Sequence, residues 1–349
     1  MLALFTEEQE MLRDMAASLA SSVGIGSPQD LETVDRAKGW KSVADAGLLG
    51  LRARDTDGTP TSSGVEVMLV AEAFGGGLVP LPFISSGILA PELLSLAAAP
   101  KALVDELAEG TARAALLLRR DLTGLAHVDD LAGAVAWGTE EAAYGLALSG
   151  PGDGPRVVRV RLDKGFSPMG SADLTGSFLR PDAPVDAGQV EEVGSPLSRD
   201  QLDQWLALAL VAVSGDLVGV MRAAMQGVVA YSKERIAYGV PIGSFQAIQH
   251  MCADMLVRSE SGTTTTSYAA WAVDELEPRE ALMAARTAKA YVALWGRDVT
   301  ENVMQAYGGI GHTWEHIAHF YTRRALTDTQ LFGDASEQLL RIADMRLGA

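Results

Sequence analysis

The chain has 349 residues, enough for a sizeable core in one large unit or two to three compact domains. Its hydrophobic content of 48% and mean hydropathy of +0.13 argue against disorder. The formal net charge of −17 argues against a nucleic-acid surface, although a locally positive pocket can still bind a phosphorylated small ligand.

Residues 1–110 are predicted to form a helical domain. Thr6 and Gln9 have the spacing of a capping box before an apolar helical stripe. Because the first residues turn acidic without a basic, signal-length start, we expect a cytoplasmic protein. Further helices are predicted at about 40–51, 65–74, 85–97 and 101–108.

Residues 111–192 have the texture of a small β domain. Short apolar runs alternate with turn residues, as at 150–155, and the run at 156–162 is rich in valine. We predict six to eight strands here.

Residues 193–349 are predicted to form a bundle of long helices. Ser198 and Gln201 make a second capping box, and an apolar run then reaches Lys233 with only Asp216 and Arg222 charged in its middle. Such a helix is a bundle core rather than a surface element. No apolar run reaches the ~18 charge-free residues of a membrane span. Later helices are predicted to start near 244, 279, 313 and 335, so the fold class is α+β with helical, β and helical domains in that order.

The stretch ERIAYGVPIGSFQAIQH, residues 234–250, lies between two of the long helices. Arg235 offers a fork of donors suited to phosphate oxygens, and Tyr238 stands beside Gly239, which permits close backbone approach. Gln246 offers an amide in the first turn of a helix, where anions are favoured.

A second marked stretch, QAYGGIGHTWEH, covers residues 305–316. Gly308 and Gly309 remove side chains where a flat or phosphate-bearing ligand could press on the backbone, and Gln305 is placed one turn earlier. A helix–turn–helix with glycine caps and a structural ion pair explains the same residues without a ligand.

The remaining cysteine and histidine residues do not predict a metal site. The single cysteine, Cys252, falls in an apolar helical stripe and is expected to be buried. His312, His316 and His319 are spaced like ligands on one helix face but lack the HExxH order.

The two stretches resemble the signatures of the acyl-CoA dehydrogenase family. The likeness is specific over about 199–345, and the order of domains extends it over the whole chain. It implies a tetramer that binds FAD at a subunit interface and acyl-CoA in a cleft between the bundle and the β domain. In this family a carboxylate removes the α proton while a hydride leaves the β carbon for the flavin, and electron-transfer flavoprotein is the expected acceptor.

The resemblance assigns roles residue by residue. It places Arg235 on the FAD pyrophosphate, Tyr238 beside it and Gln246 in the next helix. Gln305, Gly308 and Gly309 match the segment that reaches the adenosine part of a neighbour's FAD. Glu315 matches a common acidic position, for which we expect a structural pairing with Arg323 or Arg324.

The catalytic base is missing from both of its usual positions. Phe332 stands where the family carries its glutamate, and Ala209 stands at the second known location. Neither side chain can accept a proton. Asp216, on the same helix face as Ala209, is a weak candidate, and structural pairing is the expected role for it.

The flavin-ring motifs of the β domain are also not recognisable, and the chain is short for the family. These features resemble the shorter subunit of actinobacterial heteromeric acyl-CoA dehydrogenases, some of which act on sterol side chains and in which a full-length partner supplies the base. Two alternatives stay open: a self-sufficient homotetramer with a relocated carboxylate, and a catalytically silent scaffold subunit.

Overall fold

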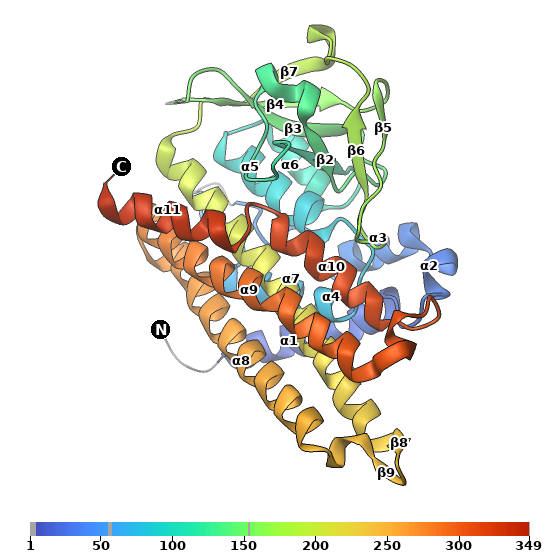
Figure 1. Cartoon of the computed structure of the whole chain (residues 1–349). Helices are drawn as coiled ribbons and strands as arrows, with labels where there is room; N and C mark the ends of the chain where they lie inside the picture. The colour runs from blue at the N-terminus through green and yellow to red at the C-terminus, as the bar shows by residue number, and fades with distance from the viewer. Residues whose placement is uncertain (1–4, 55–57, 153, 349) are drawn as a thin grey trace.

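The computed structural model describes residues 5–54, 58–152 and 154–348. A seven-stranded sheet lies at one end of the molecule, long helices form the other end, and the N-terminal helices pack beside the long ones (Figure 1). The predicted α+β class, with its helical, β and helical order, is confirmed.

The N-terminal segment is helical, as expected. The helices are α1 Glu7–Val23, α2 Asp30–Thr33, α3 Arg36–Asp45, α4 Gly64–Gly76, the π-helical turn η1 Phe83–Leu89, α5 Ala90–Leu96 and α6 Lys101–Ala108. The Thr6 capping box is present at the start of α1. The helix predicted for 40–51 starts earlier and ends at Asp45, because the chain turns at Gly47, whose φ of +74° favours glycine.

The middle segment forms one sheet in the order β5-β6-β2-β1-β3-β4-β7, within the predicted range of six to eight strands. Its β1 and β3 pair in parallel, and the other neighbours pair antiparallel. The strands are β1 Ala114–Leu118, β2 Val135–Trp137, β3 Tyr144–Ser149, β4 Arg156–Arg161, β5 Phe166–Pro168, β6 Phe178–Pro181 and β7 Val190–Val193, with short 3-10 turns η2 Val128–Gly133 and η3 Ala187–Gln189.

Five helices form the C-terminal bundle. They are α7 Arg199–Glu234, α8 Gln246–Glu275, α9 Pro278–Tyr307, α10 Ala318–Gln330 and α11 Ala335–Leu347. The hairpin β8 Ile236–Ala237 and β9 Val240–Pro241, followed by the 3-10 turn η4 Ile242–Ser244, joins α7 to α8. The Ser198 capping box begins α7 as predicted. The helix expected near Thr313 begins only at Ala318, because the glycine-rich 3-10 turn η5 Gly308–His312 and a non-helical connection follow α9.

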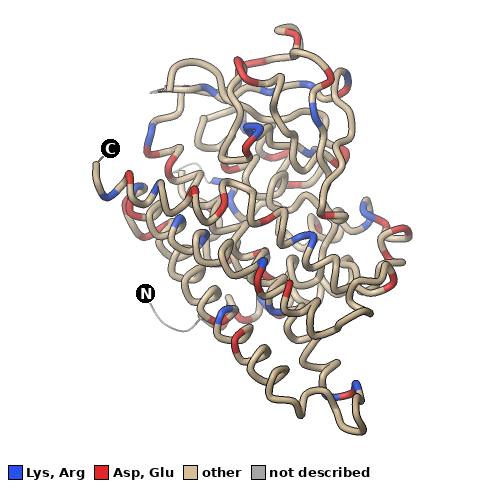
Figure 2. The backbone as a smooth tube through the Cα atoms, viewed as in Figure 1, with Lys and Arg blue, Asp and Glu red and all other residues tan. Residues whose placement is uncertain are grey.

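The helix α7 is the core of the molecule. Among the described residues it is the one helix long and apolar enough to cross a membrane, with a mean hydropathy of 1.8 over 18 residues. However, 83% of that window is buried inside the protein, as in the core helix of a globular fold. Basic and acidic residues are interspersed along the chain and do not gather on one element (Figure 2).

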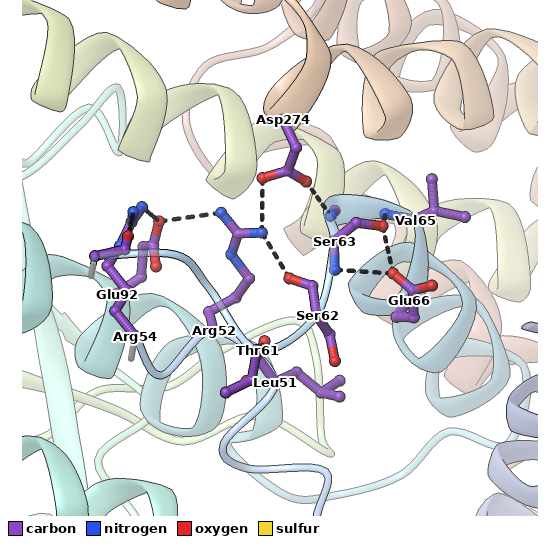
Figure 3. A network of polar contacts seen from close by, with 12 residues as sticks. Leu51, Arg52, Arg54, Thr61, Ser62, Ser63, Val65, Glu66, Glu92 and Asp274 are labelled. Atoms are coloured by element: carbon purple, nitrogen blue, oxygen red, sulfur yellow. Dashed lines mark hydrogen bonds and ion pairs between the residues drawn. The ribbon is translucent and has the colours of Figure 1, made fainter. Parts of the chain in front are cut away.

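A buried ion network joins the N-terminal helices to the bundle (Figure 3). The fully buried Arg52 contacts Glu92 of α5 at 3.2 Å and Asp274 of α8 at 2.9 Å. Asp274 also accepts a hydrogen bond from the backbone N–H of Gly64 at 2.6 Å, at the start of α4. Arg54 contacts Glu92 from the other side at 2.6 Å. This network fixes α4, α5 and α8 relative to one another.

Candidate functional site

The first predicted stretch forms the hairpin that projects from the far end of α7 and α8 (Figure 1). Arg235 is the C-cap residue of α7, and its exposed guanidinium makes no ion pair within the described part of the chain. Tyr238 is 98% exposed and has a φ of +53°, which is uncommon for a residue other than glycine. Its ring meets that of Phe245 edge-on at 6.3 Å. The hairpin therefore presents a free arginine and an aromatic side chain to solvent.

Gln246 is the first residue of α8 and is exposed. Because the first N–H groups of a helix have no partner within it, they favour an anion at this point. Arg235 and this helix start lie at the two ends of one short hairpin.

The second stretch lies at the C-terminal end of α9. Gln305 is exposed, and Gly308 ends the helix with a φ of +63°. A Cβ added at Gly308 or at Gly309 would meet no atom within 4 Å, so the backbone is open to an approaching ligand or chain. The rings of Tyr231, one turn before Arg235, and Tyr307 are 4.9 Å apart. Both predicted stretches therefore lie at the same end of the bundle within one chain.

These residues fit the phosphate and adenosine parts of FAD. They supply a free guanidinium, a helix N-terminus and glycine backbone without obstruction, and all six predicted FAD residues are exposed or half-buried. Since they face outward, another chain must cover them to enclose a cofactor. The contacts of these six residues with FAD stay predictions.

Between the sheet and the bundle, the described residues enclose a cavity much smaller than FAD or an acyl-CoA. The cavity there has a volume of about 50 Å³, little more than that of a water molecule. Side chains from several parts of the fold line it, among them Phe74, Trp137, Asp173, Thr175, Asp216, Arg324 and Asp328. An acyl thioester is far larger than this cavity.

Phe332, at the expected position of the base, follows Leu331, which lines this cavity, and is itself buried in the core. It is 1% exposed, and its ring packs edge-on against Trp137 at 6.0 Å and Trp205 at 5.8 Å. Its N–H donates to the carbonyl of Leu122, and the buried Gln338 donates to its carbonyl at 2.6 Å. The backbone φ of +60° directs this side chain into the core. Ala209 is also fully buried, so neither usual base position carries a proton acceptor.

Asp216 has the structural role expected for it. Arg324 of α10 donates to both of its carboxylate oxygens, at 2.8 and 2.6 Å, and also to the carbonyl of Val79 at 2.9 Å. Burial lowers the pKa of Arg324, but the charge and hydrogen bonds of Asp216 outweigh burial and raise that pKa overall. The Arg324 guanidinium therefore stays charged beside Asp216.

The pairing predicted for Glu315 is wrong. Glu315 is exposed, Arg324 is committed to Asp216, and Arg323 donates to the Nδ1 atom of His319 at 3.2 Å. His316 has a local role, since its Nδ1 atom accepts the N–H of Ala318 at the start of α10. Within the residues that the structure describes, no three histidine, cysteine or acidic side chains gather as metal ligands. Cys252 is only partly buried, contrary to expectation.

Lys289 of α9 is fully buried next to the C-terminal end of α10. Its ammonium donates to the carbonyls of Asp328 at 2.6 Å and Thr329 at 3.1 Å, in the last turn of α10. Burial lowers its pKa to about 7, with Asp328 acting in the opposite direction. The pKa of Asp328 is raised by burial and by the neighbouring charge of Asp216. Lys289 thus caps the helix that leads into Phe332.

This environment predicts a pH-dependent stability. Between pH 7 and 10.5 the folded protein loses the Lys289 proton while the unfolded chain keeps it, so the free energy of unfolding should rise with pH. Urea unfolding at several pH values in this window should show a smaller rise for Lys289→Met than for the unsubstituted chain. The exposed Lys38→Met is the control and should keep the full rise. Equal slopes in Lys289→Met and the unsubstituted chain would contradict the assignment.

The helical, β and helical order, with the two predicted stretches at one end of the bundle, is the architecture expected from the resemblance. The model for the acyl-CoA dehydrogenase C-terminal domain matches residues 203–347. This match and the curated relatives support membership of the acyl-CoA dehydrogenase family. Members of this family are flavoproteins that use FAD.

Two mycobacterial proteins illustrate the relationship in sequence. The chain is 28% identical to the acyl-CoA dehydrogenase FadE34 of Mycobacterium tuberculosis over 98% of its own length, but it spans only 48% of that protein. It is 28% identical to the acyl-CoA dehydrogenase IpdE2 of the same organism, with 96% of each chain covered. The chain therefore has the length of IpdE2 and about half the length of FadE34.

Solved structures show the same fold. The Tcur3481-Tcur3483 steroid acyl-CoA dehydrogenase variant matches with a TM-score of 0.82, at 23% identity and 98% coverage of both chains. A chain of the ChsE4-ChsE5 complex from Mycobacterium tuberculosis matches with a TM-score of 0.76, at 21% identity over all of both chains.

Proposed function

We propose that this chain is a subunit of an FAD-dependent acyl-CoA dehydrogenase whose catalytic carboxylate comes from a partner chain of the same family. The observation that carries this proposal is the segment around Phe332, where a buried aromatic side chain packed against Trp137 and Trp205 stands at the position expected for the base. The outward-facing Arg235 hairpin supports it, because those residues need a second chain to enclose a ligand.

The chain's own residues then bind and orient, and do not transfer protons. Arg235 and the start of α8 hold phosphate oxygens, while Gly308 and Gly309 admit the adenosine part against the backbone. FAD held by these residues would supply the acceptor for a hydride from the β carbon of an acyl-CoA thioester. The buried Phe332, packed against Trp205 and the half-buried Trp137, offers no group that could accept a proton.

Two of the similar solved structures have names that each give two components, and one of these names describes a steroid enzyme. These names support a heteromeric assembly for this chain. We propose a steroid or fatty acyl-CoA as the substrate class and a tetramer as the assembly. We further propose electron-transfer flavoprotein as the electron acceptor and the cytoplasm as the location.

Co-expression with a full-length homologue that carries the glutamate tests the proposal. The purified complex should show flavin absorbance and acyl-CoA-dependent reduction of an electron acceptor, and this chain alone should show no turnover. Full turnover by the chain alone would remove the partner requirement. Absence of flavin from both preparations would instead favour a silent scaffold.

Arg235→Met tests the hairpin within that complex. Losing a charged hydrogen bond of about 1.5–3 kcal/mol should weaken FAD binding roughly ten- to hundredfold. The affinity can be measured by titrating FAD into the apo complex and following flavin fluorescence. Arg346→Met, at an exposed position in the last turn of α11, is the matched control and should bind FAD as before. Unchanged affinity in Arg235→Met would rule out this phosphate contact.

Phe332→Glu tests whether the missing carboxylate is the chain's only deficiency. We expect no turnover from this variant alone, because its glutamate would be buried against two tryptophan rings. An acyl-CoA oxidation assay with an artificial acceptor measures this. Turnover by Phe332→Glu without a partner would show that the chain can form a complete site.

A further inference from the structure

A second cavity lies in the sheet, away from both FAD stretches. It has a volume of about 390 Å³ and is lined by ends of β3, β4 and β7 and by the η3 turn. The register places Tyr144 of β3 directly opposite Arg161 of β4, and Arg159 directly opposite Glu191 of β7. Because side chains alternate along a strand, Tyr144, Arg159, Arg161 and Glu191 project from one face of the sheet.

Two hydrogen-bond donors beside this cavity are buried and unused. Tyr144 is 8% exposed, and its hydroxyl has no partner among the described residues. The Nε atom of Arg159 is likewise buried and unpartnered, and the Arg159 guanidinium carbon lies 5.3 Å from the Tyr144 ring centre. Buried polar atoms usually have partners, so two unmet donors at one cavity call for an acceptor that the chain does not supply.

Arg161 adds a third free donor group. Its guanidinium makes no ion pair in the described part of the chain, although its carbonyl accepts a hydrogen bond from the Gln189 side chain. Gln189 also donates to the carbonyl of Lys164, so it fixes the cavity wall and has little left for a ligand. Burial raises the pKa of Tyr144, with Glu106 acting in the same direction, and its hydroxyl therefore keeps its proton as a donor.

The acidic neighbours limit the charge that the cavity can accept. Glu191 already accepts from the Nη2 atom of Arg159 at 2.5 Å, and Glu106 of α6 acts electrostatically on Tyr144. The cavity therefore combines unmet donors and a free arginine with acidic groups nearby. This favours one oxyanion group and disfavours a polyanion.

We propose that this cavity binds a small ligand through a single phosphate or carboxylate group, held by the Tyr144 hydroxyl, the Arg159 Nε atom and the Arg161 guanidinium. The volume is within the range of small-molecule sites. The site is separate from the FAD-binding residues and does not depend on the function proposed above.

Isothermal titration of the full chain tests this proposal with inorganic phosphate, butyrate and pyrophosphate at constant ionic strength. We expect saturable binding of phosphate or butyrate, which identifies the preferred oxyanion, and weaker binding of pyrophosphate. Tyr144→Phe removes only the unpartnered hydroxyl, and Arg161→Met removes only the exposed guanidinium, so both variants should fold. Each should bind the preferred probe at least fivefold more weakly.

Arg119→Met is the matched control, since Arg119 is exposed and lies outside the cavity. It should bind the probe as the unsubstituted chain does. Absence of saturable binding by phosphate and butyrate would overturn the proposal. Binding that survives unchanged in both Tyr144→Phe and Arg161→Met would also overturn it.

Discussion

Replacing Phe332 with alanine is expected to lower the free energy of unfolding by about 3–5 kcal/mol, the range for large aromatic side chains in cores. Phe332 is almost fully buried and packs edge-on against two tryptophan rings, so its removal leaves a cavity and ends both aromatic contacts. Trp137 belongs to the sheet and Trp205 to α7, so the lost contacts are those that join the sheet to the bundle.

Urea unfolding monitored by tryptophan fluorescence measures this effect, and the signal should report the change around Trp137 and Trp205 directly. Phe245→Ala is the matched control, because Phe245 is 38% exposed and makes one edge contact, with Tyr238. Its loss should be below about 1 kcal/mol. A comparably small loss in Phe332→Ala would mean that the packing of Phe332 against the two tryptophans adds little to stability.

Much of the fold could be predicted because the local signals agreed with one another. The capping boxes at Thr6 and Ser198 identified two helix starts, and the long apolar run identified α7 as the core. Glycine-rich connections were harder to place. The start of α10 was predicted at Thr313 but lies at Ala318, since a 3-10 turn can follow glycine where periodicity alone extends a helix.

The candidate site was only partly accessible from the sequence. Phe332 could be recognised as a poor base, but its packing between Trp137 and Trp205 depends on chain segments far apart in sequence. Lys289 and Gln338, whose hydrogen bonds hold the segment around Phe332, were not predicted from the sequence. A lysine within the apolar stripe of α9 was a signal for the first of these, because a buried lysine requires acceptors.

Asp216 and Arg324 carry the second large effect. They form a buried ion pair at the edge of the small interior cavity, with the two donor distances at 2.8 and 2.6 Å. Removing one partner of a buried pair leaves an uncompensated charge, whereas replacing both with apolar residues of similar size can cost little. The single and double variants should therefore differ in stability.

We expect the single variants Asp216→Leu and Arg324→Met each to lower the free energy of unfolding by about 3–5 kcal/mol, and the two substitutions combined to cost clearly less. Urea unfolding of the two single variants and the double variant measures the coupling between the partners. Asp45→Ala is the control, because its pair with Lys41 is exposed and should contribute less than about 1 kcal/mol. Additive losses in the double variant would contradict the pairing.

A substitution of Asp216 also distinguishes a structural role for this residue from a catalytic one. If Asp216 is structural, Asp216→Asn should lower stability and leave the turnover number of the assembled complex unchanged at a temperature where it stays folded. A proton-abstracting carboxylate would instead lose nearly all turnover on conversion to an amide, with FAD still bound. Because Asp216 is tied to Arg324 through both oxygens, we expect the first result, which would exclude Asp216 as the base of the assembled enzyme.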